Sequence, residues 1–311
     1  MKSLLARVFL LVGFITWSGL CVRAEEGGRS HTLAGDKASF AGVLPTETGA
    51  TFRFKMMFYD GNVDKNSTGK YGQYQYAELE RSFSSSQFEL AYVKSEPGEG
   101  LRYGFEMCLP LVYESAAAYA YQEGFYDINA YTYDYEGGLG DISFIPLMVG
   151  KQIGSNHIKT GVRLYAPTGY YRSGHLAQGG LNHWTYSPFL GLTNVVPGKH
   201  ELSLYTGYDI NERNTDTDYK SGDAIHMDAV AAMYTDMYTA VGLTGSLYEQ
   251  TSPDSGSGAT LGSFKAKSYT VGPMIRHTAG SMNFELKWLP EVRVENRTRG
   301  GSFWINFGMP F

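Results

Sequence analysis

The chain has 311 residues, of which 43% are hydrophobic and 18% are charged, and its formal net charge is −5. This acidic balance argues against nucleic acid as a partner, because proteins that bind nucleic acid carry basic patches that neutralise phosphates. After residue 24 no apolar run approaches the roughly 18 residues of a membrane-spanning helix, so the sequence predicts no such helix there.

The N-terminus has the pattern of a secretory signal. Two basic residues, Lys2 and Arg7, precede an almost continuous apolar run over residues 8–20, and Ala24 supplies a small-residue cleavage site. We expect cleavage after Ala24, with an uncleaved anchor as the alternative. Cleavage removes one of the two cysteines and three of the 26 basic residues, which leaves Cys108 alone and 23 basic against 31 acidic residues. No disulfide can then form within the chain.

Residues 25–49 come before the first expected strand and are rich in Gly, Ser, Thr and Glu. They lack the apolar period that marks a helix or a strand. Two interpretations remain open for this stretch: a flexible N-terminal segment, or a short plug folded into the interior of the domain that follows.

From residue 50 onward apolar and polar side chains alternate, and this pattern predicts strands because successive strand residues point to opposite faces. The C-terminal segment is the clearest case. Its apolar face carries Phe303, Ile305, Phe307, Met309 and Phe311. We expect twelve strands, at 51–60, 75–93, 101–113, 140–151, 157–167, 185–195, 200–211, 223–234, 237–249, 264–277, 281–295 and 301–311.

The connections between these strands distinguish a membrane barrel from a soluble β-sandwich. Short turns at 154–156, 197–199, 235–236 and 279–281 alternate with longer loops at about 117–138, 168–183, 211–223 and 251–262. This alternation is typical of bacterial outer-membrane barrels, in which periplasmic turns are short and extracellular loops are long. The sequence therefore predicts an all-β fold for residues 50–311: a transmembrane, antiparallel up-and-down β-barrel of about twelve strands in the bacterial outer membrane.

Some details of this barrel stay open. Residues 84–86 are three serines within the second segment that could form a turn, so ten or fourteen strands remain alternatives. Four prolines fall inside expected strands, where each removes a ladder hydrogen bond, and we expect local bulges there. They are Pro146, Pro188, Pro273 and Pro290. The closing Phe311 predicts recognition by the barrel-assembly machinery.

Several short blocks occur in order along the chain. They include Gly138-Leu139-Gly140-Asp141, Leu164-Tyr165-Ala166-Pro167-Thr168-Gly169-Tyr170, Asp216-Thr217-Asp218-Tyr219, Gly242-Leu243-Thr244-Gly245 and Leu286-Lys287-Trp288. Together, from about residue 42 to the end, they resemble the outer-membrane proteins associated with the meta-pathway of phenol degradation. The resemblance implies a barrel that takes up hydrophobic or aromatic small molecules. Larger fatty-acid channels, to which this family is distantly similar, carry an N-terminal hatch with an Asn-Pro-Ala motif that is absent here.

Charged residues of both signs share the polar faces of the expected strands. A basic side chain facing lipid costs about 2–4 kcal/mol at the middle of the membrane, so we expect these residues to point into the lumen. The candidates for the lumen and the path of a solute are Arg163, Asp209, His226, Asp228, Arg276, Glu285, Lys287, Glu291 and Arg293. They either select which solutes enter, or pair with one another to fill a narrow barrel.

A second group of candidates lies in the expected loop at 117–138. It comprises the tyrosines Tyr119, Tyr121, Tyr126, Tyr131, Tyr133 and Tyr135. This extracellular aromatic loop would capture apolar solutes by stacking, or it would extend the ring of interfacial aromatic residues above the membrane. Acidic residues crowd 209–223, where a solvated loop is favoured over surface calcium binding because the twelve-residue calcium-loop pattern is absent.

The function that these patterns favour is passive uptake of small, hydrophobic or aromatic molecules through an outer-membrane channel, whose partners are membrane lipid and a small-molecule solute. A structural or adhesive barrel that acts through its loops is the alternative. A lipid-modifying enzyme is less favoured: His226 and Asp228 could act as base and orienting group, but no residue pattern marks a nucleophile. The seven histidines show no metal spacing, so we expect no metal and no cofactor.

Overall fold

The computed structural model describes residues 24–68, 74–95, 100–123, 128–260 and 262–310. The expected signal peptide up to residue 23, Tyr126 and Phe311 lie outside this set. Within the described residues there are thirteen strands and one short 3-10 helix, η1 (Glu26–Gly28). The strands are β1 (Gly49–Thr68), β2 (Tyr74–Ser95), β3 (Leu101–Gln122), β4 (Ile128–Leu139), β5 (Ser143–Ile153), β6 (Asn156–Tyr165), β7 (Thr185–Val196), β8 (His200–Asn211), β9 (Ala224–Tyr234), β10 (Thr239–Gln250), β11 (Lys267–Ala279), β12 (Met282–Glu295) and β13 (Arg299–Pro310).

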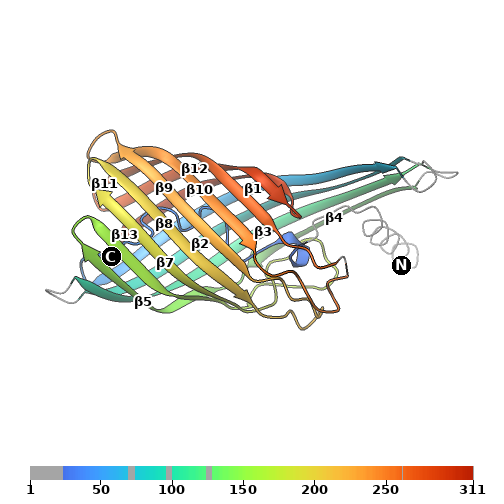
Figure 1. The fold of residues 1–311 in the computed structure, drawn as a ribbon, viewed down its shortest axis with the longest axis horizontal. Coiled ribbons are helices and arrows are strands. Elements are labelled where there is room, and N and C mark those ends of the chain that lie inside the picture. Colours follow the sequence, from blue (N-terminus) through green and yellow to red (C-terminus); the bar gives the residue numbers. More distant parts are fainter. Residues whose placement is uncertain (1–23, 69–73, 96–99, 124–127, 261, 311) are drawn as a thin grey trace.

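The strands form one closed antiparallel barrel (Figure 1). Strands that follow one another in the chain pair with each other, except that β5 pairs with β3 instead of β4. The pairing of β1 with β13, from Thr51↔Pro310 to Asn62↔Arg299, closes the ring. The wall has twelve positions rather than thirteen because β4 and β5 both pair with β3, one above the other. The prediction of twelve strands is confirmed. Ten or fourteen are excluded because β2 pairs with β1 without a break through residues 84–86.

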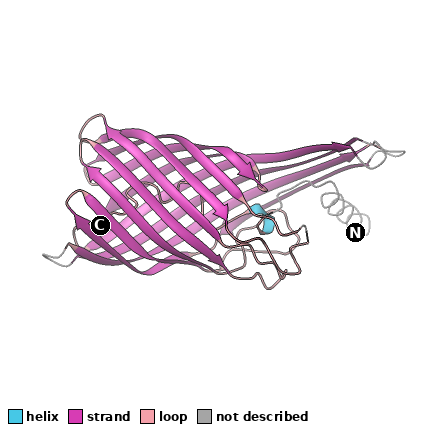
Figure 2. Ribbon diagram, viewed as in Figure 1, coloured by secondary structure: helices cyan, strands magenta, loops and turns pink. Residues whose placement is uncertain are grey.

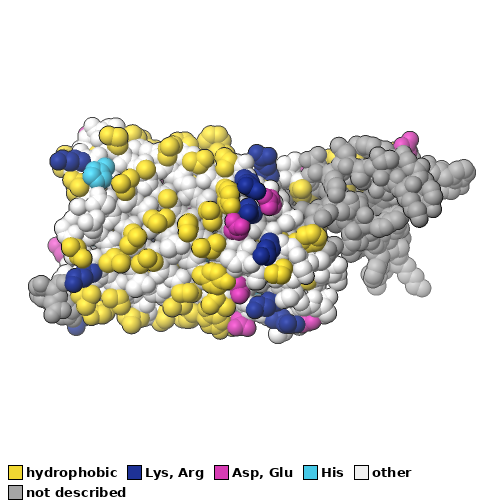
Figure 3. Space-filling view, viewed as in Figure 1, with side chains coloured by type: hydrophobic (Ala, Val, Ile, Leu, Met, Phe, Trp, Pro, Cys, Tyr) yellow, Lys and Arg dark blue, Asp and Glu magenta, His cyan; other side chains and the backbone are white. Residues whose placement is uncertain are grey.

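The alternation of side chains along each strand separates a wet interior from an apolar exterior. On β8, Glu201 and Ser203 are buried inside the barrel, whereas Leu202 and Leu204 are exposed on the outside. Figure 3 shows hydrophobic side chains over the barrel wall and charged side chains near its two ends, with the larger group at one of them. No helix among the described residues is long and apolar enough to cross a membrane.

The two ends of the barrel differ in their connections. One end, called the turn end, carries the short turns 154–155, 197–199, 235–238 and 280–281. The opposite end, called the loop end, carries the longer connections 166–184, 212–223 and 251–266. The expected alternation of short and long connections is therefore present from β5 to β12, while the β12–β13 connection at the loop end is short.

Four strands continue past the loop end of the wall. At about 3.3 Å per residue, the 22 residues of β3 extend for about 70 Å, well beyond the roughly 30 Å core of a bilayer even when tilted. Residues 61–68, 74–82, 115–122 and 128–136 form a four-stranded sheet there, called the projection, which extends to the right in Figure 2. The expected loop at 117–138 is wrong, because most of this stretch belongs to β3 and β4.

The prolines interrupt the ladder, but the expected bulge does not form at each of them: β7 lacks pairs with β8 at residues 187–188, and its register there does not shift. Around Pro146 the register shifts in both ladders of β5, with β3 and with β6. The ladder between β11 and β12 lacks pairs opposite Pro273 and Pro290, and its register shifts by one residue between Tyr269 and Thr270. That shift leaves Val292 as an extra residue on β12. The residues of β12 after Val292 therefore point to the face of the wall opposite to the one that simple alternation gives them.

Candidate solute path through the barrel

Residues 24–48, called the N-terminal segment, run through the barrel interior. Backbone N–H groups of Gly35 and Lys37 both donate to the Asp228 carboxylate on β9, each at 2.9 Å. The N–H of Phe40 donates to Glu201 on β8 at 2.7 Å. A segment without regular structure leaves its backbone groups unsatisfied unless other residues bind them. Inward-facing carboxylates of the wall supply that pairing here.

Side chains of the N-terminal segment add further contacts toward the loop end. Arg29 Nη1 lies 2.6 Å from Glu114 on β3, whose side chain is fully buried. His31 lies between Asp141 at 3.0 Å and Thr185 at 2.8 Å. These contacts join the segment to β3, to the β4–β5 connection and to β7, so they fix its position against this part of the wall.

Ion pairs hold the middle of the segment to β1 and β2. Lys37 Nζ lies 2.9 Å from Glu89 and 2.7 Å from Asp36. Lys55 on β1 completes the group, at 2.5 Å from Asp36 and 2.6 Å from Glu89. All four side chains are largely shielded from solvent, where ion pairs interact more strongly than on a surface.

Glycine allows the segment to lie directly against the wall at one point. A Cβ atom at Gly191 on β7 would lie 2.1 Å from the carbonyl oxygen of Ala41, and one at Gly42 would lie 2.5 Å from the carbonyl oxygen of His157. Both distances are too short for a non-bonded contact between a carbon and an oxygen atom. Gly42 N also donates to Thr193 Oγ1 at 3.0 Å. The backbones meet here because neither glycine has a side chain.

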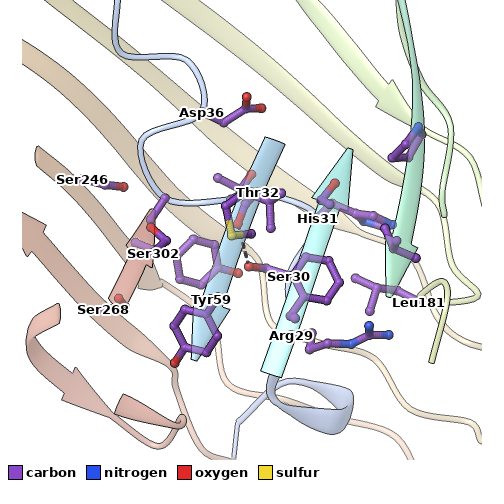
Figure 4. A pocket seen from close by; sticks show the side chains of 18 of the residues that line it. Arg29, Ser30, His31, Thr32, Asp36, Tyr59, Leu181, Ser246, Ser268 and Ser302 are labelled. Atoms are coloured by element: carbon purple, nitrogen blue, oxygen red, sulfur yellow. Dashed lines mark hydrogen bonds between the residues drawn. The ribbon is translucent and has the colours of Figure 1, made fainter. Parts of the chain in front are cut away.

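A cavity of about 170 Å³ remains between the N-terminal segment and the wall formed by β1, β2, β3 and β10–β13. Figure 4 shows Ser246, Ser268 and Ser302 on the wall facing Thr32 and its neighbours on the segment. Toward the turn end it is closed by a buried apolar group comprising Met57, Leu289 and Trp304, with Leu33 of the segment packed against it.

A second cavity, of about 180 Å³, lies nearer the loop end, between η1 and the β6–β7 connection. Both cavities are lined by Arg29, Gly180 and Leu181, which therefore separate them. His183 also lines the second cavity, and burial together with the neighbouring His31 lowers the pKa of His183 to about 4. His183 is consequently neutral at the pH of most environments.

The structure places eight of the nine predicted lumen residues on the inner face. Seven are buried: Arg163, Asp209, His226, Asp228, Arg276, Glu285 and Lys287. Glu291 lines the first cavity. The placement of Arg293 is wrong: its side chain is 57% exposed and pairs with Glu295 at 2.6 Å. The extra residue at Val292 reverses the alternation, so Arg293 points outward.

Most of the inward charges are neutralised locally. Arg163 pairs with Glu106 at 2.5 Å, and Lys287 pairs with Glu285 at 3.1 Å. Arg276 lies between Glu201 and Glu285. These pairs satisfy the polar side chains that share the lumen with the N-terminal segment, as buried charges require.

His226 does not contact Asp228 as a catalytic base would contact its orienting group. Its Nε2 lies 3.2 Å from both Asp209 and Ser187, while its Nδ1 has no hydrogen-bond partner among the described residues. A nucleophile and an orienting carboxylate need to bind opposite ring nitrogens, so this arrangement is not a proton relay.

The five predicted tyrosines that the structure describes belong to the projection rather than to a loop: Tyr119, Tyr121, Tyr131, Tyr133 and Tyr135. Tyr131, Tyr133 and Tyr135 lie on the outer face of β4 and are 66%, 53% and 64% exposed. Tyr119 on β3 pairs across the ladder with Tyr131. The opposite face of the projection is packed, since alanines at positions 77, 118 and 120 are buried against Leu176 of the β6–β7 connection.

Apart from Glu291, the residues that line the first cavity are not identified from the sequence. Tyr59, Thr270 and Ser302 were not singled out, and neither were Arg29 or Lys37 of the N-terminal segment. The available signal is weak: small hydroxyl residues at inward positions of several strands, and two basic residues within a Gly-rich stretch.

The chain is similar in fold to a crystallised outer membrane channel from Pseudomonas putida F1, with a TM-score of 0.68 and 14% identity over 90% of this chain and all of that one. Two other solved structures are less similar, each with a TM-score of 0.41 and 10% identity. The match to the NanC porin covers 82% of this chain and 100% of the porin. The match to the translocator domain of the autotransporter NalP from Neisseria meningitidis covers 85% of this chain and 89% of that domain. No curated protein matches the chain. The family model described as "Putative MetA-pathway of phenol degradation" matches residues 64–307, so the chain belongs to this family.

Proposed function

We propose that the protein is an outer-membrane channel for passive uptake of small hydrophobic or aromatic molecules, and that the N-terminal segment closes its lumen. The observation that carries this proposal is the content of the lumen. Wall side chains do not fill it. A separate stretch of chain crosses it, and cavities remain on two sides of Arg29. Displacing the segment would join these cavities into a passage.

The lining of the first cavity supports an apolar or aromatic solute. Phe83 and Val112 of the wall and Leu33 of the segment contribute apolar surface, while a few hydroxyl groups face the same space. Binding sites for small molecules typically combine a mostly apolar lining with few polar groups. The apolar exterior and the strand architecture support the outer membrane as the site of action.

Liposome swelling tests the proposal. Vesicles that contain the full chain are mixed with phenol, benzoate or a disaccharide, and swelling is measured against protein-free vesicles because phenol also crosses lipid unaided. We expect the protein to accelerate phenol entry more than benzoate entry, and to leave disaccharide entry near the background rate. Equal rates with and without protein for all three solutes would contradict a channel function.

The adhesive alternative is supported by one observation, the projection with its exposed tyrosines beyond the barrel wall. A variant shortened by residues 64–78 and 119–131 distinguishes the two functions. If the protein is a channel, the shortened variant retains solute entry. If the protein is an adhesin, cells that carry the shortened variant no longer attach to surfaces, and the full chain shows no solute entry.

A further inference from the structure

Asp254, in the β10–β11 connection at the loop end, is a buried carboxylate whose side-chain partners are all neutral. The residue is only 1% exposed. Its oxygens accept hydrogen bonds from the Tyr219 hydroxyl at 2.7 Å, from the Gly222 N–H at 2.8 Å and from Gln250 Nε2 at 2.8 Å. No lysine, arginine or histidine in the described part of the chain forms an ion pair with it. A buried charge is costly unless an opposite charge compensates it.

The fourth donor to Asp254 is the backbone nitrogen of Glu25, which lies 2.7 Å from Oδ2. Glu25 is itself only 3% exposed, and the cation nearest to its carboxylate is Arg297, whose Nε lies 3.5 Å from Oε2. That oxygen accepts no hydrogen bond from the described residues. Two buried carboxylates therefore share one cation, and one further positive charge at the nitrogen of Glu25 would balance the group.

The backbone at Glu25 is strained where it joins the preceding residue. Glu25 has φ 62° and ψ 147°, a combination that residues with a side chain rarely adopt because the Cβ atom crowds the preceding carbonyl group. If the peptide bond between Ala24 and Glu25 is cleaved, no carbonyl group precedes Glu25. The strain is then absent.

Cleavage after Ala24, which the sequence predicts, supplies the missing charge as well. Hydrolysis by a signal peptidase adds the hydroxyl group of one water molecule to the carbonyl carbon of Ala24 and its proton to the nitrogen of Glu25. An α-amino group titrates near pH 8, and a neighbouring carboxylate favours its charged form, so this amine takes up a second proton at neutral pH. Ala24 is fully buried in the folded barrel, so the peptidase has to act before the barrel closes.

We propose that the loop end contains a binding site for the chain's own N-terminal ammonium group, which cleavage between Ala24 and Glu25 creates and which Asp254 holds in a buried ion pair. The pair fixes the first residue of the N-terminal segment at the loop end, whereas the other end of the segment continues into β1 at the turn end. The site is independent of the solute that the channel takes.

Two measurements on the protein purified from outer membranes test this site. The intact mass should correspond to a chain that begins at Glu25, and a different first residue would overturn the proposal. The rate of reaction with 2-pyridinecarboxaldehyde, which is selective for N-terminal amines, reports whether the ammonium group is bound. We expect the folded chain to react at least about tenfold more slowly than the same chain unfolded in urea. Equal rates would overturn the proposal.

Asp254→Asn removes the negative charge and keeps the shape of the side chain. Loss of a hydrogen bond between charged groups weakens a contact by at least about tenfold, so the folded variant should react about tenfold faster than the unaltered folded chain. Asp223→Asn is the matched control, because Asp223 also accepts a backbone N–H at the loop end, from Asn211 at 3.0 Å. Equal rates in the two folded variants would overturn the ion pair. If Asp254→Asn does not fold, the comparison of the folded and unfolded unaltered chain decides.

Discussion

Replacing Asp228 by alanine tests whether the N-terminal segment blocks the lumen. The Asp228 carboxylate accepts the N–H groups of Gly35 and Lys37, both at 2.9 Å, and therefore holds the segment at its midpoint. A hydrogen bond to a charged group contributes about 1.5–3 kcal/mol. Losing two bonds at the lower value removes about 3 kcal/mol, which raises the population of the displaced segment about 150-fold.

Alkylation of Cys108 measures that population. Cys108 is a free, buried cysteine on the inner face of β3 and lines the first cavity beside the segment. A bulky, membrane-impermeant maleimide reaches it only after the segment moves. If the segment returns faster than the reagent reacts, the labelling rate is proportional to the displaced population. We expect Asp228→Ala to label about 150-fold faster than the unaltered chain.

Asp236→Ala is the matched control for this experiment. Asp236 also accepts two backbone N–H groups, from Tyr238 and Thr239 at 2.7 and 2.8 Å, but it lies in the exposed β9–β10 turn. Its replacement should leave the labelling rate unchanged. A labelling rate in Asp228→Ala equal to that of the control would refute the reasoning, provided that both variants show the heat-dependent gel shift of a folded barrel.

Three further predictions concern the wall and its contacts. Leu243→Arg places a charge on the outer face of β10 and should destabilise the membrane-embedded barrel by about 2–4 kcal/mol. Tyr131→Arg on the projection should change the stability by less than about 0.5 kcal/mol. Equal effects of the two substitutions in urea unfolding would contradict the assignment of the apolar band. Glu114→Gln leaves the buried Arg81 and the partly buried Arg29 without their carboxylate and should cost about 3–5 kcal/mol, seen as a lower unfolding temperature. An unchanged temperature would contradict the buried ion pair. Gly191→Val adds a side chain where the Ala41 carbonyl oxygen lies, so it should accelerate Cys108 labelling. The unfolding temperature should fall by no more than a few degrees. An unchanged labelling rate would show that the two backbones do not meet there.

Local patterns predict most of the wall of this barrel. The alternation in segments such as 303–311 and the short turns between strands are properties of neighbouring residues, and twelve strands follow from them. The projection was misread for a physical reason. A membrane strand is expected to have about 9–11 residues, so the prediction places the end of this strand at the membrane boundary. The alanines and tyrosines that continue the alternation at the end of β3 are therefore assigned to a loop.

Features that depend on distant contacts could not be predicted in the same way. Arg293 points outward because of the single extra residue at Val292, and a bulge leaves little trace in a sequence. The N-terminal segment has no apolar period because carboxylates from β8 and β9, more than 150 residues away, satisfy its backbone. Tyr59 on β1 and Ser302 on β13 both line the first cavity, and they become neighbours only when the barrel closes.

Single-channel recording in planar bilayers tests the central claim most directly. The full chain is compared with a variant that lacks residues 25–42, which removes the contacts to Glu114, Asp228 and Glu201 together. We expect the full chain to be closed for most of the recording, and the shortened chain to give a stable open conductance at least tenfold higher on average. Equal conductance of the two folded chains would contradict a lumen that the N-terminal segment closes.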